Sequence, residues 1–349
     1  MSEQLSEFAT EYEARGAGAV MWEMITGYRV SQIVRVAAAL SLAEHCADGP
    51  VSAAEVARLE SADVTATARF LRACAAIGLV KCVDGPRFAA TPLLAALHRD
   101  TPGSLRGFAL SLSAKGHWLP WGQLLEAVKD GEHQAVGTLG RELFAYYATE
   151  PGEAAAFTDG LQGMTSVAGA EAARVIDTTG TRLAVDVGGA SGDLLHDLMR
   201  VNPELEGIVL DLPHVTPDAL AAAARQGLDG RLSVVPGDFF EAVPEGGDLY
   251  LLRYVLHDWD DEKCVRILSN CRRAMRPGSR VLVLEMILGE VGREPVVVPS
   301  QDLNMLVLLG GRERTVEQFD ELFKAAGLRR TAVTETESPM SVIEAVAQD

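Results

Sequence analysis

The chain has 349 residues, of which 48% are hydrophobic and 23% charged, and its formal net charge at pH 7 is −18. This length suits two domains with sizeable cores, and the hydrophobic fraction excludes a largely disordered chain. The strong negative charge repels phosphate backbones and therefore disfavours a nucleic-acid partner.

The N-terminal segment MSEQLSEFATEYEARG is polar and acidic, so we expect no signal peptide. The apolar runs are far shorter than the roughly 20 residues that a membrane span requires. The five cysteines form no C-x-x-C pair and show no zinc-ligand spacing, which indicates reduced thiols and no metal site. We therefore expect a cytoplasmic protein that does not bind a membrane.

Residues 51–90 carry the pattern of a winged helix. Ser52 and Glu55 form a capping box, and the helical segment TATARFLRACAAIG ends at Gly78. Two strand patterns, LVKCV and RFAA, flank the turn DGP and predict a two-stranded wing. Such a module can bind DNA, but the acidic chain and the few basic residues of its second helix favour packing or dimerisation.

Residues 104–175 predict helices that bridge the two halves of the chain. The segment HWLPWGQLL brings Trp118 and Trp121 close together, and ELFAYYATEP adds Phe144. Two neighbouring tryptophans are more typical of packing than of ligand binding, so this region alone indicates no site.

From residue 181 onward, short apolar runs alternate with helical segments, which indicates parallel βαβ units. Five such runs are RLAVDVG, GIVLD, LSVVPGD, DLYLL and RVLVLE. Two further runs, RRTAVTET and SVIEAVA, predict an antiparallel pair at the sheet edge. The predicted fold class is therefore α/β, with a doubly wound Rossmann-like sheet after a mostly helical winged-helix domain. Sheets of this kind bind ligands at the carboxyl ends of their strands.

The first predicted strand ends in a glycine turn, VDVGGASGD. Gly188 and Gly192 allow the backbone to turn tightly and to approach a ligand closely. A dinucleotide fingerprint that starts at Gly188 requires glycine at positions 190 and 193, where the chain has Ala190 and Asp193. The turn is therefore a poor match for a pyrophosphate.

Polar residues also end the next two strands. Asp211 follows the glycine turn at a spacing that allows it to accept both hydroxyls of a ribose. Asp238 can accept from an exocyclic amine, and Phe239 can lie against a purine face. Each carboxylate alone is equally consistent with a helix cap or a solvated loop. Three successive strand ends together predict an adenosine ligand that lacks a polyphosphate.

The fourth strand ends in LLRYVLHDWDD, where an apolar run leads directly into His257 and three carboxylates. One interpretation is a polar loop that closes a core strand. The other is a base delivered to a site beside the predicted adenosine. Asp260 and Asp261 fit the start of the next helix, where acidic side chains complement the helix dipole.

Four motifs together, VDVGGASG, GDFFE, YVLHDWDDEKC and GGRERT, resemble the S-adenosylmethionine-dependent small-molecule O-methyltransferases. The nearest resemblance is to bacterial enzymes that methylate aromatic natural products and are related to plant caffeate-type enzymes. It covers essentially the whole chain. It implies S-adenosylmethionine as cofactor, a small aromatic substrate and a homodimer. It also implies a dimerisation domain at 1–104, linking helices at 105–175 and a catalytic domain at 176–349.

Carried over by position, the resemblance implies roles for individual residues. Gly188 approaches the amino-acid part of the cofactor, and Arg253 lies against the cofactor. Asp211, Asp238 and Phe239 keep the ribose and adenine roles given above. His257 is the catalytic base, and two acids, Glu285 and Glu313, flank and orient it.

Two further expectations complete the predicted site. Ala190 stands where the family usually has a third glycine, and we expect crowding at most. Apolar side chains line the substrate side, with an asparagine as polar anchor: Trp118, Trp121, Phe144, Met164, Asn304, Met305 and Leu308.

The predicted reaction is methyl transfer to a hydroxyl, most simply a phenol, of an aromatic or polyketide-type natural product. A phenol with a pKa of about 10 is mostly protonated at neutral pH, and a histidine with a pKa near ~6.5 can take its proton. One alternative is a relative that keeps the cofactor for hydroxylation or decarboxylation, but such relatives often lack the histidine. Others are an N- or C-methyltransferase and a non-enzymatic winged-helix regulator, which the charge disfavours.

Overall fold

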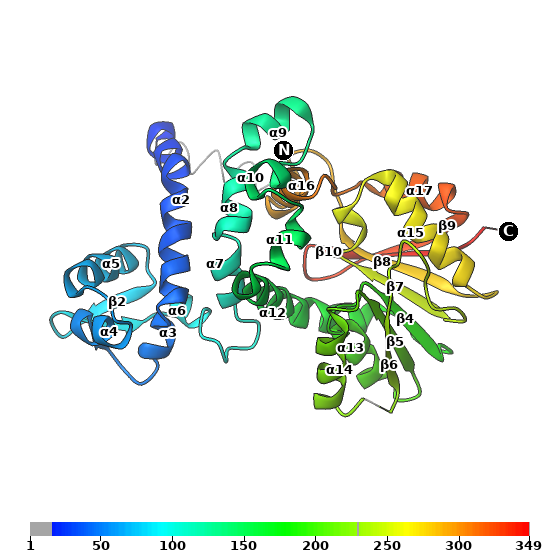
Figure 1. Cartoon of the computed structure of the whole chain (residues 1–349), viewed down its shortest axis with the longest axis horizontal. Coiled ribbons are helices and arrows are strands. Elements are labelled where there is room, and N and C mark those ends of the chain that lie inside the picture. Colours follow the sequence, from blue (N-terminus) through cyan, green and yellow to red (C-terminus); the bar gives the residue numbers. More distant parts are fainter. Residues whose placement is uncertain (1–15, 229, 349) are drawn as a thin grey trace. The chain divides into compact units, whose positions relative to one another are not determined.

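The computed structural model describes residues 16–228 and 230–348, apart from the side chains of residues 164–168 and 170 (Figure 1). Two sequence expectations fall outside this part: the polar segment at residues 1–15 and the side chain of Met164. The chain divides into two compact units. One comprises Met1–Gly122 and Ala135–Met164, and the other Gln123–Gln134 and Thr165–Asp349. The predicted boundaries at 1–104, 105–175 and 176–349 stay a prediction.

In its described residues the first unit is mostly helical, and its helices are short apart from the first, the fourth and the last. The last helix continues into the second unit. The helices are α2 (Ala17–Ala39), α3 (Leu42–His45), α4 (Ala53–Leu59), α5 (Val64–Ala76), α6 (Pro92–Ala95), α7 (Arg106–Ser111), α8 (Lys115–Trp121), α10 (Ala135–Leu139), α11 (Leu143–Tyr147) and α12 (Pro151–Val175).

The helix pair α4 and α5 is followed by a β-hairpin, as the winged-helix pattern predicts. The Glu55 amide donates to Ser52 Oγ at 3.2 Å and the Ser52 amide donates to Glu55 Oε2 at 2.6 Å, which confirms the capping box. The hairpin strands are β2 (Val80–Val83) and β3 (Arg87–Ala90). A third strand, β1 (Val51–Ser52), pairs with β3. It is too short for its alternation to be visible in the sequence.

The second unit contains a seven-stranded sheet in the order β6-β5-β4-β7-β8-β10-β9. The first five strands in this order are parallel, and β10 lies antiparallel between β8 and β9. This arrangement confirms the predicted α/β fold. The strands are β4 (Leu183–Val187), β5 (Glu206–Asp211), β6 (Leu232–Pro236), β7 (Leu249–Arg253), β8 (Arg280–Met286), β9 (Leu328–Glu335) and β10 (Met340–Ala347).

Helices cover both faces of this sheet (Figure 1). Because side chains alternate along a strand, Tyr250 and Leu252 of β7 pack with α15 and α17, whereas Leu249 and Leu251 pack with α13 and α14. Burial on both faces explains why the strands are continuous apolar runs. The helices are α9 (Leu124–Asp130), α13 (Asp193–Val201), α14 (Thr216–Arg225), α15 (Asp261–Ala274), α16 (Val297–Leu308) and α17 (Val316–Ala325), with a 3₁₀ helix η1 (Leu256–Asp258).

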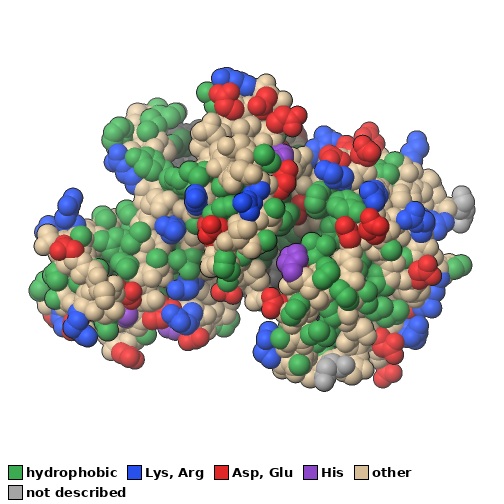
Figure 2. Space-filling model, viewed as in Figure 1, with side chains coloured by type: hydrophobic (Ala, Val, Ile, Leu, Met, Phe, Trp, Pro, Cys, Tyr) green, Lys and Arg blue, Asp and Glu red, His purple; other side chains and the backbone are tan. Residues whose placement is uncertain are grey.

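The strand order reverses between β4 and β7, and this is where open α/β sheets form a ligand crevice. Charged side chains of both signs are interspersed over the face shown in Figure 2. The prediction against a nucleic-acid partner stays a prediction. Among the described residues, the helices lack the combined length and apolar character that crossing a membrane requires.

Candidate active site

The glycine turn after β4 brings the backbone close to two other strand ends. Gly188 has φ +72°, and a Cβ atom built on it would lie 3.1 Å from Val255 Cγ2 and 3.4 Å from Phe239 Cε1. At Gly192, with φ +80°, a Cβ atom would lie 2.9 Å from Val209 Cγ2. Both positions therefore require glycine, for backbone conformation as well as for space.

Ala190 differs from the expectation of simple crowding. Its φ is +48°, in the left-handed region that non-glycine residues rarely adopt. The cost of alanine here is therefore backbone strain, on the order of 1–2 kcal/mol. The amide of Ala190 donates to Asp211 Oδ2 at 2.8 Å, and this bond holds the strained turn against the end of β5.

Asp211 ends β5 with its carboxylate fixed by two backbone donors. Besides Ala190, the amide of Leu212 donates to Oδ1 at 2.7 Å. A carboxylate has about four acceptor positions, so Asp211 can accept further hydrogen bonds such as those of a ribose. Burial raises the pKa of Asp211, and its backbone donors oppose that shift.

Asp238 and Phe239 follow β6 at the same edge of the sheet. Asp238 is exposed, and its Oδ1 accepts from the Phe240 amide at 2.8 Å. The ring of Phe239 packs edge-on against Phe240, with 4.9 Å between the centroids, and its backbone oxygen accepts from Asn270 Nδ2 at 2.7 Å. The residues predicted to hold adenine are thus anchored to α15 through Asn270.

Sequence analysis missed Asp186, which lies inside β4 and is only 1% exposed. Burial raises its pKa to about 6, and the nearby charge of Arg253 opposes this. Within the described chain, Asp186 Oδ2 and Arg253 Nη1 are both buried without a hydrogen-bond partner. One acceptor and one cationic donor therefore lack partners beside the glycine turn. They fit a ligand that carries both an ammonium and a carboxylate, as the amino-acid part of S-adenosylmethionine does. A carboxylate within an otherwise apolar strand was the available signal in the sequence.

The backbone of the His257 turn is held by Glu285, a fully buried residue near the end of β8. Its Oε1 atom accepts from the amides of Val255 at 3.1 Å and Leu256 at 2.9 Å. Just before this turn, Tyr254 has φ +53°, an uncommon conformation for an aromatic residue. Glu285 therefore acts mainly on the backbone that carries His257, a role that the sequence did not reveal.

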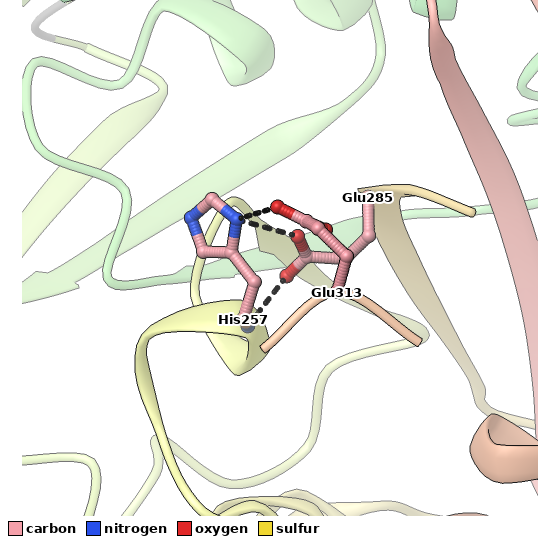
Figure 3. Close-up of side chains that lie close together, drawn as sticks. All are labelled: His257, Glu285 and Glu313. Atoms are coloured by element: carbon pink, nitrogen blue, oxygen red, sulfur yellow. Dashed lines mark hydrogen bonds and ion pairs between the residues drawn. The ribbon is translucent and has the colours of Figure 1, made fainter. Parts of the chain in front are cut away.

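The imidazole of His257 is held at Nδ1, where Glu313 Oε1 lies 2.8 Å away (Figure 3). Glu285 Oε2 lies on the same side of the ring, 3.5 Å from Nδ1. On the other side, Nε2 is 3.4 Å from Asp258 Oδ1. The side chain of His257 is almost fully buried. Anchoring at Nδ1 leaves Nε2 as the nitrogen that can exchange a proton with a ligand.

Three acids around His257 make it a stronger base than an isolated histidine. Burial lowers its pKa, but the charges of Glu285, Asp258 and Glu313 outweigh burial and raise the pKa to about 10. Burial raises the pKa of Glu285 to about 7, against the charge of His257. The expectation of a histidine near its ordinary pKa is therefore wrong for this environment. The proton affinity of His257 instead comes close to that of a phenol, whose pKa is about 10.

His257, Glu285 and Glu313 are also residue types that ligate metals, and they offer one atom each within 4.8 Å of one another. Two observations favour a hydrogen-bonded histidine instead. The 2.8 Å between Nδ1 and Glu313 Oε1 is a hydrogen-bond distance, and Glu285 already accepts from backbone amides. The predicted absence of a metal stays a prediction.

The residues predicted to line the substrate side are divided between the two units. Trp118 and Phe144 are partly exposed in α8 and α11, while Met305 and Leu308 are buried in α16. Trp121 ends α8, Asn304 lies in α16, and Met164 lies in α12 with an undescribed side chain. This set of substrate residues stays a prediction.

Comparison with family models matches residues 121–329 to an O-methyltransferase domain and residues 22–100 to an O-methyltransferase dimerisation domain. A phenazine O-methyltransferase, PhzM from Lysobacter antibioticus, is 37% identical over 96% of this chain and 99% of that protein.

Two solved structures extend this similarity. The mitomycin 7-O-methyltransferase MmcR has a TM-score of 0.91 and 31% identity, over 97% of this chain and 99% of that chain. Human N-acetylserotonin methyltransferase in complex with SAM has a TM-score of 0.87 and 30% identity, over 96% of this chain and 98% of that chain.

Proposed function

The chain belongs to the S-adenosylmethionine-dependent O-methyltransferases, and from this premise we propose that it methylates a phenolic hydroxyl with His257 as general base. The observation that carries the proposal is the anchoring of His257 Nδ1 by Glu313, which leaves Nε2 available. The names of its relatives support an aromatic acceptor, since phenazine, mitomycin and acetylserotonin are aromatic or quinone-type compounds. We therefore expect an aromatic or polyketide-type natural product as the substrate.

Five residues would hold the cofactor in this proposal: Gly188, Asp211, Asp238, Phe239 and Arg253. When bound, S-adenosylmethionine supplies an electrophilic methyl group. The unpartnered polar atoms of Asp186 and Arg253 support binding of its amino-acid part beside the glycine turn. Holding the reactants in near-attack geometry can contribute about 7–11 kcal/mol toward lowering the barrier.

The chain's own contribution to the chemistry is the control of one proton. As the acceptor oxygen reacts, its proton passes to Nε2 of His257, and the imidazole becomes an imidazolium. Glu313 stabilises this cation through Nδ1 and fixes the tautomer in which Nε2 is free. Glu285 holds the turn so that the ring keeps its direction. The three acids that raise the pKa of His257 stabilise the imidazolium that forms when it takes the proton, and the neutral, proton-accepting form becomes more abundant as pH rises.

We further propose that the protein is a homodimer whose partner chain closes part of the substrate site. Helix α2 exposes Met21, Met24, Ile25 and Tyr28 along one stripe with helical spacing, and Trp22 beside it is 62% exposed. Figure 2 shows hydrophobic side chains gathered at one end of this helix. An apolar stripe of this size on a unit that matches a dimerisation domain is best covered by a second copy.

All five cysteines are free, which supports a reducing, cytoplasmic location.

The experiment that tests the reaction is incubation of the purified protein with labelled S-adenosylmethionine and a panel of phenols, arylamines and aliphatic alcohols. We expect a mass increase of one methyl group on phenols, located on oxygen by fragmentation. Methylation of arylamines alone would show that the protein is an N-methyltransferase. A hydroxylated or decarboxylated product would also contradict the proposal.

A further inference from the structure

Arg314 is a buried cation that the reaction described so far does not use. It follows Glu313 directly, in the segment between α16 and α17, and its side chain is 0% exposed. Its backbone oxygen accepts from the Leu288 amide at 3.0 Å, so the segment is tied to the chain just beyond β8. Burying a guanidinium is energetically unfavourable unless its N–H groups are hydrogen-bonded. The hydrogen-bond partners of Arg314 therefore indicate its role.

The partners of Arg314 lie on both sides of His257. Nη1 donates to the Leu256 carbonyl oxygen at 3.1 Å, and Nη2 donates to the Trp259 carbonyl oxygen at 2.8 Å. Nη2 and Nε also donate to Asp261 Oδ1, at 2.8 and 3.1 Å. One planar group therefore spans the carbonyl before His257, the carbonyl after Asp258 and the start of α15. Lysine, with a single ammonium, cannot span these acceptors in the same way.

The turn that carries His257 has weak hydrogen bonds of its own. The Asp258 amide donates to the Val255 oxygen at 3.3 Å, and the Trp259 amide donates to the Leu256 oxygen at 3.2 Å. Both lie at or beyond the long end of the usual N–H···O range. The direction of the imidazole is therefore set from outside the turn. Glu285 accepts from amides at its beginning, and the guanidinium donates to its carbonyls.

The segment leading to Arg314 also passes very close to the His257 backbone. A Cβ atom built on Gly311 would lie only 2.0 Å from the His257 carbonyl oxygen. The same short segment thus supplies a glycine that permits close approach, Glu313 on the ring and Arg314 on the turn. All three residues therefore contact the backbone or the ring of the same histidine turn.

We infer that Arg314 is a positioning residue for His257, which aims Nε2 by fixing the carbonyls on either side of the base. This inference rests on the proposed role of His257. It separates the roles of two neighbouring residues: Glu313 is hydrogen-bonded to the ring, and Arg314 fixes the turn that carries the ring.

The test uses Arg314→Lys, which keeps the positive charge beside Asp261 but cannot reach both carbonyls. We expect single-turnover methyl transfer to fall roughly 10²-fold, the size of effect expected when a catalytic group is displaced by about 1 Å. Affinity for S-adenosylhomocysteine should stay at the wild-type value, because the proposed cofactor residues lie on other strand ends. Arg312→Lys is the matched control: Arg312 pairs with Oδ2 of the same Asp261 and is not bonded to either carbonyl, so its rate should not change.

The double variant His257→Gln/Arg314→Lys distinguishes positioning from a general loss of stability. If Arg314 acts through His257, the double variant should be no slower than His257→Gln alone, because the base being aimed is already gone. If the rate of the double variant instead fell by the product of the two single-variant losses, Arg314 would act independently of His257, and the inference would be overturned. A wild-type rate in Arg314→Lys would also overturn it. A wild-type rate in His257→Gln would instead remove the proposed base, and the inference with it.

A second variant guards against misfolding. Arg314→Ala leaves a cavity where the guanidinium of Arg314 was. Added guanidinium at millimolar concentration should bind there and restore part of the methyl-transfer rate. The assay uses protein whose near-ultraviolet circular dichroism and S-adenosylhomocysteine affinity match the wild type. Restoration by guanidinium but not by ammonium supports the inference, and equal or no restoration by both contradicts it.

Discussion

His257 Nδ1 and Glu313 Oε1 lie 2.8 Å apart, and the Glu313 side chain has no solvent exposure. A fully buried carboxylate has no water with which to exchange this hydrogen bond, so Glu313 holds the ring at Nδ1. The direction of the His257 ring therefore depends on Glu313 more directly than on Glu285, whose Oε2 is 3.5 Å from Nδ1.

Replacing each glutamate by glutamine separates these contributions. Glu313→Gln removes the charged acceptor at Nδ1, and we expect methyl transfer to fall about 10–10²-fold, as for loss of a charge-assisted hydrogen bond of ~1.5–3 kcal/mol. Glu285→Gln keeps an oxygen for the backbone amides, so we expect a smaller loss. Single-turnover rates with one phenol compare the two variants. A greater loss in Glu285→Gln would reverse this assignment.

Removing the base should abolish most of the reaction without affecting cofactor binding. For His257→Gln we expect methyl transfer to fall by roughly 10²–10⁴ at neutral pH, the usual contribution of a general base. The deficit should shrink toward pH 10, where a phenol ionises without help. Calorimetry with S-adenosylhomocysteine is the control. Equal rates for variant and wild type at pH 7 would mean that His257 is only the end of a core strand.

The pH dependence of the wild type tests the environment of His257. Its pKa is raised to about 10, so the neutral, proton-accepting form becomes more abundant as pH rises through the neutral range. We therefore expect the single-turnover rate to keep rising from pH 7 toward pH 10. An ordinary histidine would give a plateau above about pH 7.5. In Glu313→Gln the rise should move to lower pH, because one of the groups that raise this pKa has lost its charge.

Asp211 should control cofactor affinity. Asp211→Ala removes an acceptor for the proposed ribose and also releases the Ala190 amide. We expect affinity for S-adenosylhomocysteine to weaken tenfold or more, from a typical ~1.5–3 kcal/mol per charged hydrogen bond. Asp218→Ala, an exposed aspartate in the first turn of α14, is the control. Unchanged affinity in Asp211→Ala would exclude Asp211 from the cofactor site.

A single methyl group at Gly311 should displace His257. The built Cβ atom lies 2.0 Å from the His257 oxygen and 2.5 Å from the Asp258 carbonyl carbon, so one of the two segments must move. We expect Gly311→Ala to lower the rate at least as much as Glu313→Gln does, and to lower the thermal midpoint. Gly289→Ala is the matched control, because its nearest neighbour would be a side-chain atom at 3.6 Å. Wild-type activity in Gly311→Ala would contradict the close approach.

The edge of the sheet where the site lies could be predicted from sequence, and the buried polar contacts could not. Asp211 and His257 end apolar runs, and the carboxyl ends of parallel strands meet at one edge, so their proximity follows from periodicity. Arg314, in contrast, lies in GGRERT, a segment with the composition of a solvated loop. Its full burial depends on carbonyls contributed by residues some 55 positions earlier in the chain.

The backbone conformation at individual residues also could not be predicted from sequence patterns. Ala190 was expected to matter through volume, but its φ of +48° shows that the backbone bears the cost. The function of Glu285 as an acceptor for backbone amides depends on how the chain turns after β7, and no residue type signals that turn. The pKa of His257 follows from the distances to three acids that only the tertiary structure sets.

The position of β10 makes the strand that carries Glu285 depend on a distant part of the chain. Met340–Ala347 lie between β8 and β9, with Ser341 paired to Glu285. Without β10, β8 would be an edge strand with unpaired backbone amides and carbonyls. A local opening of β10 would therefore expose the acid that holds the His257 turn, so substitutions that weaken β10 should lower activity before the sheet as a whole unfolds.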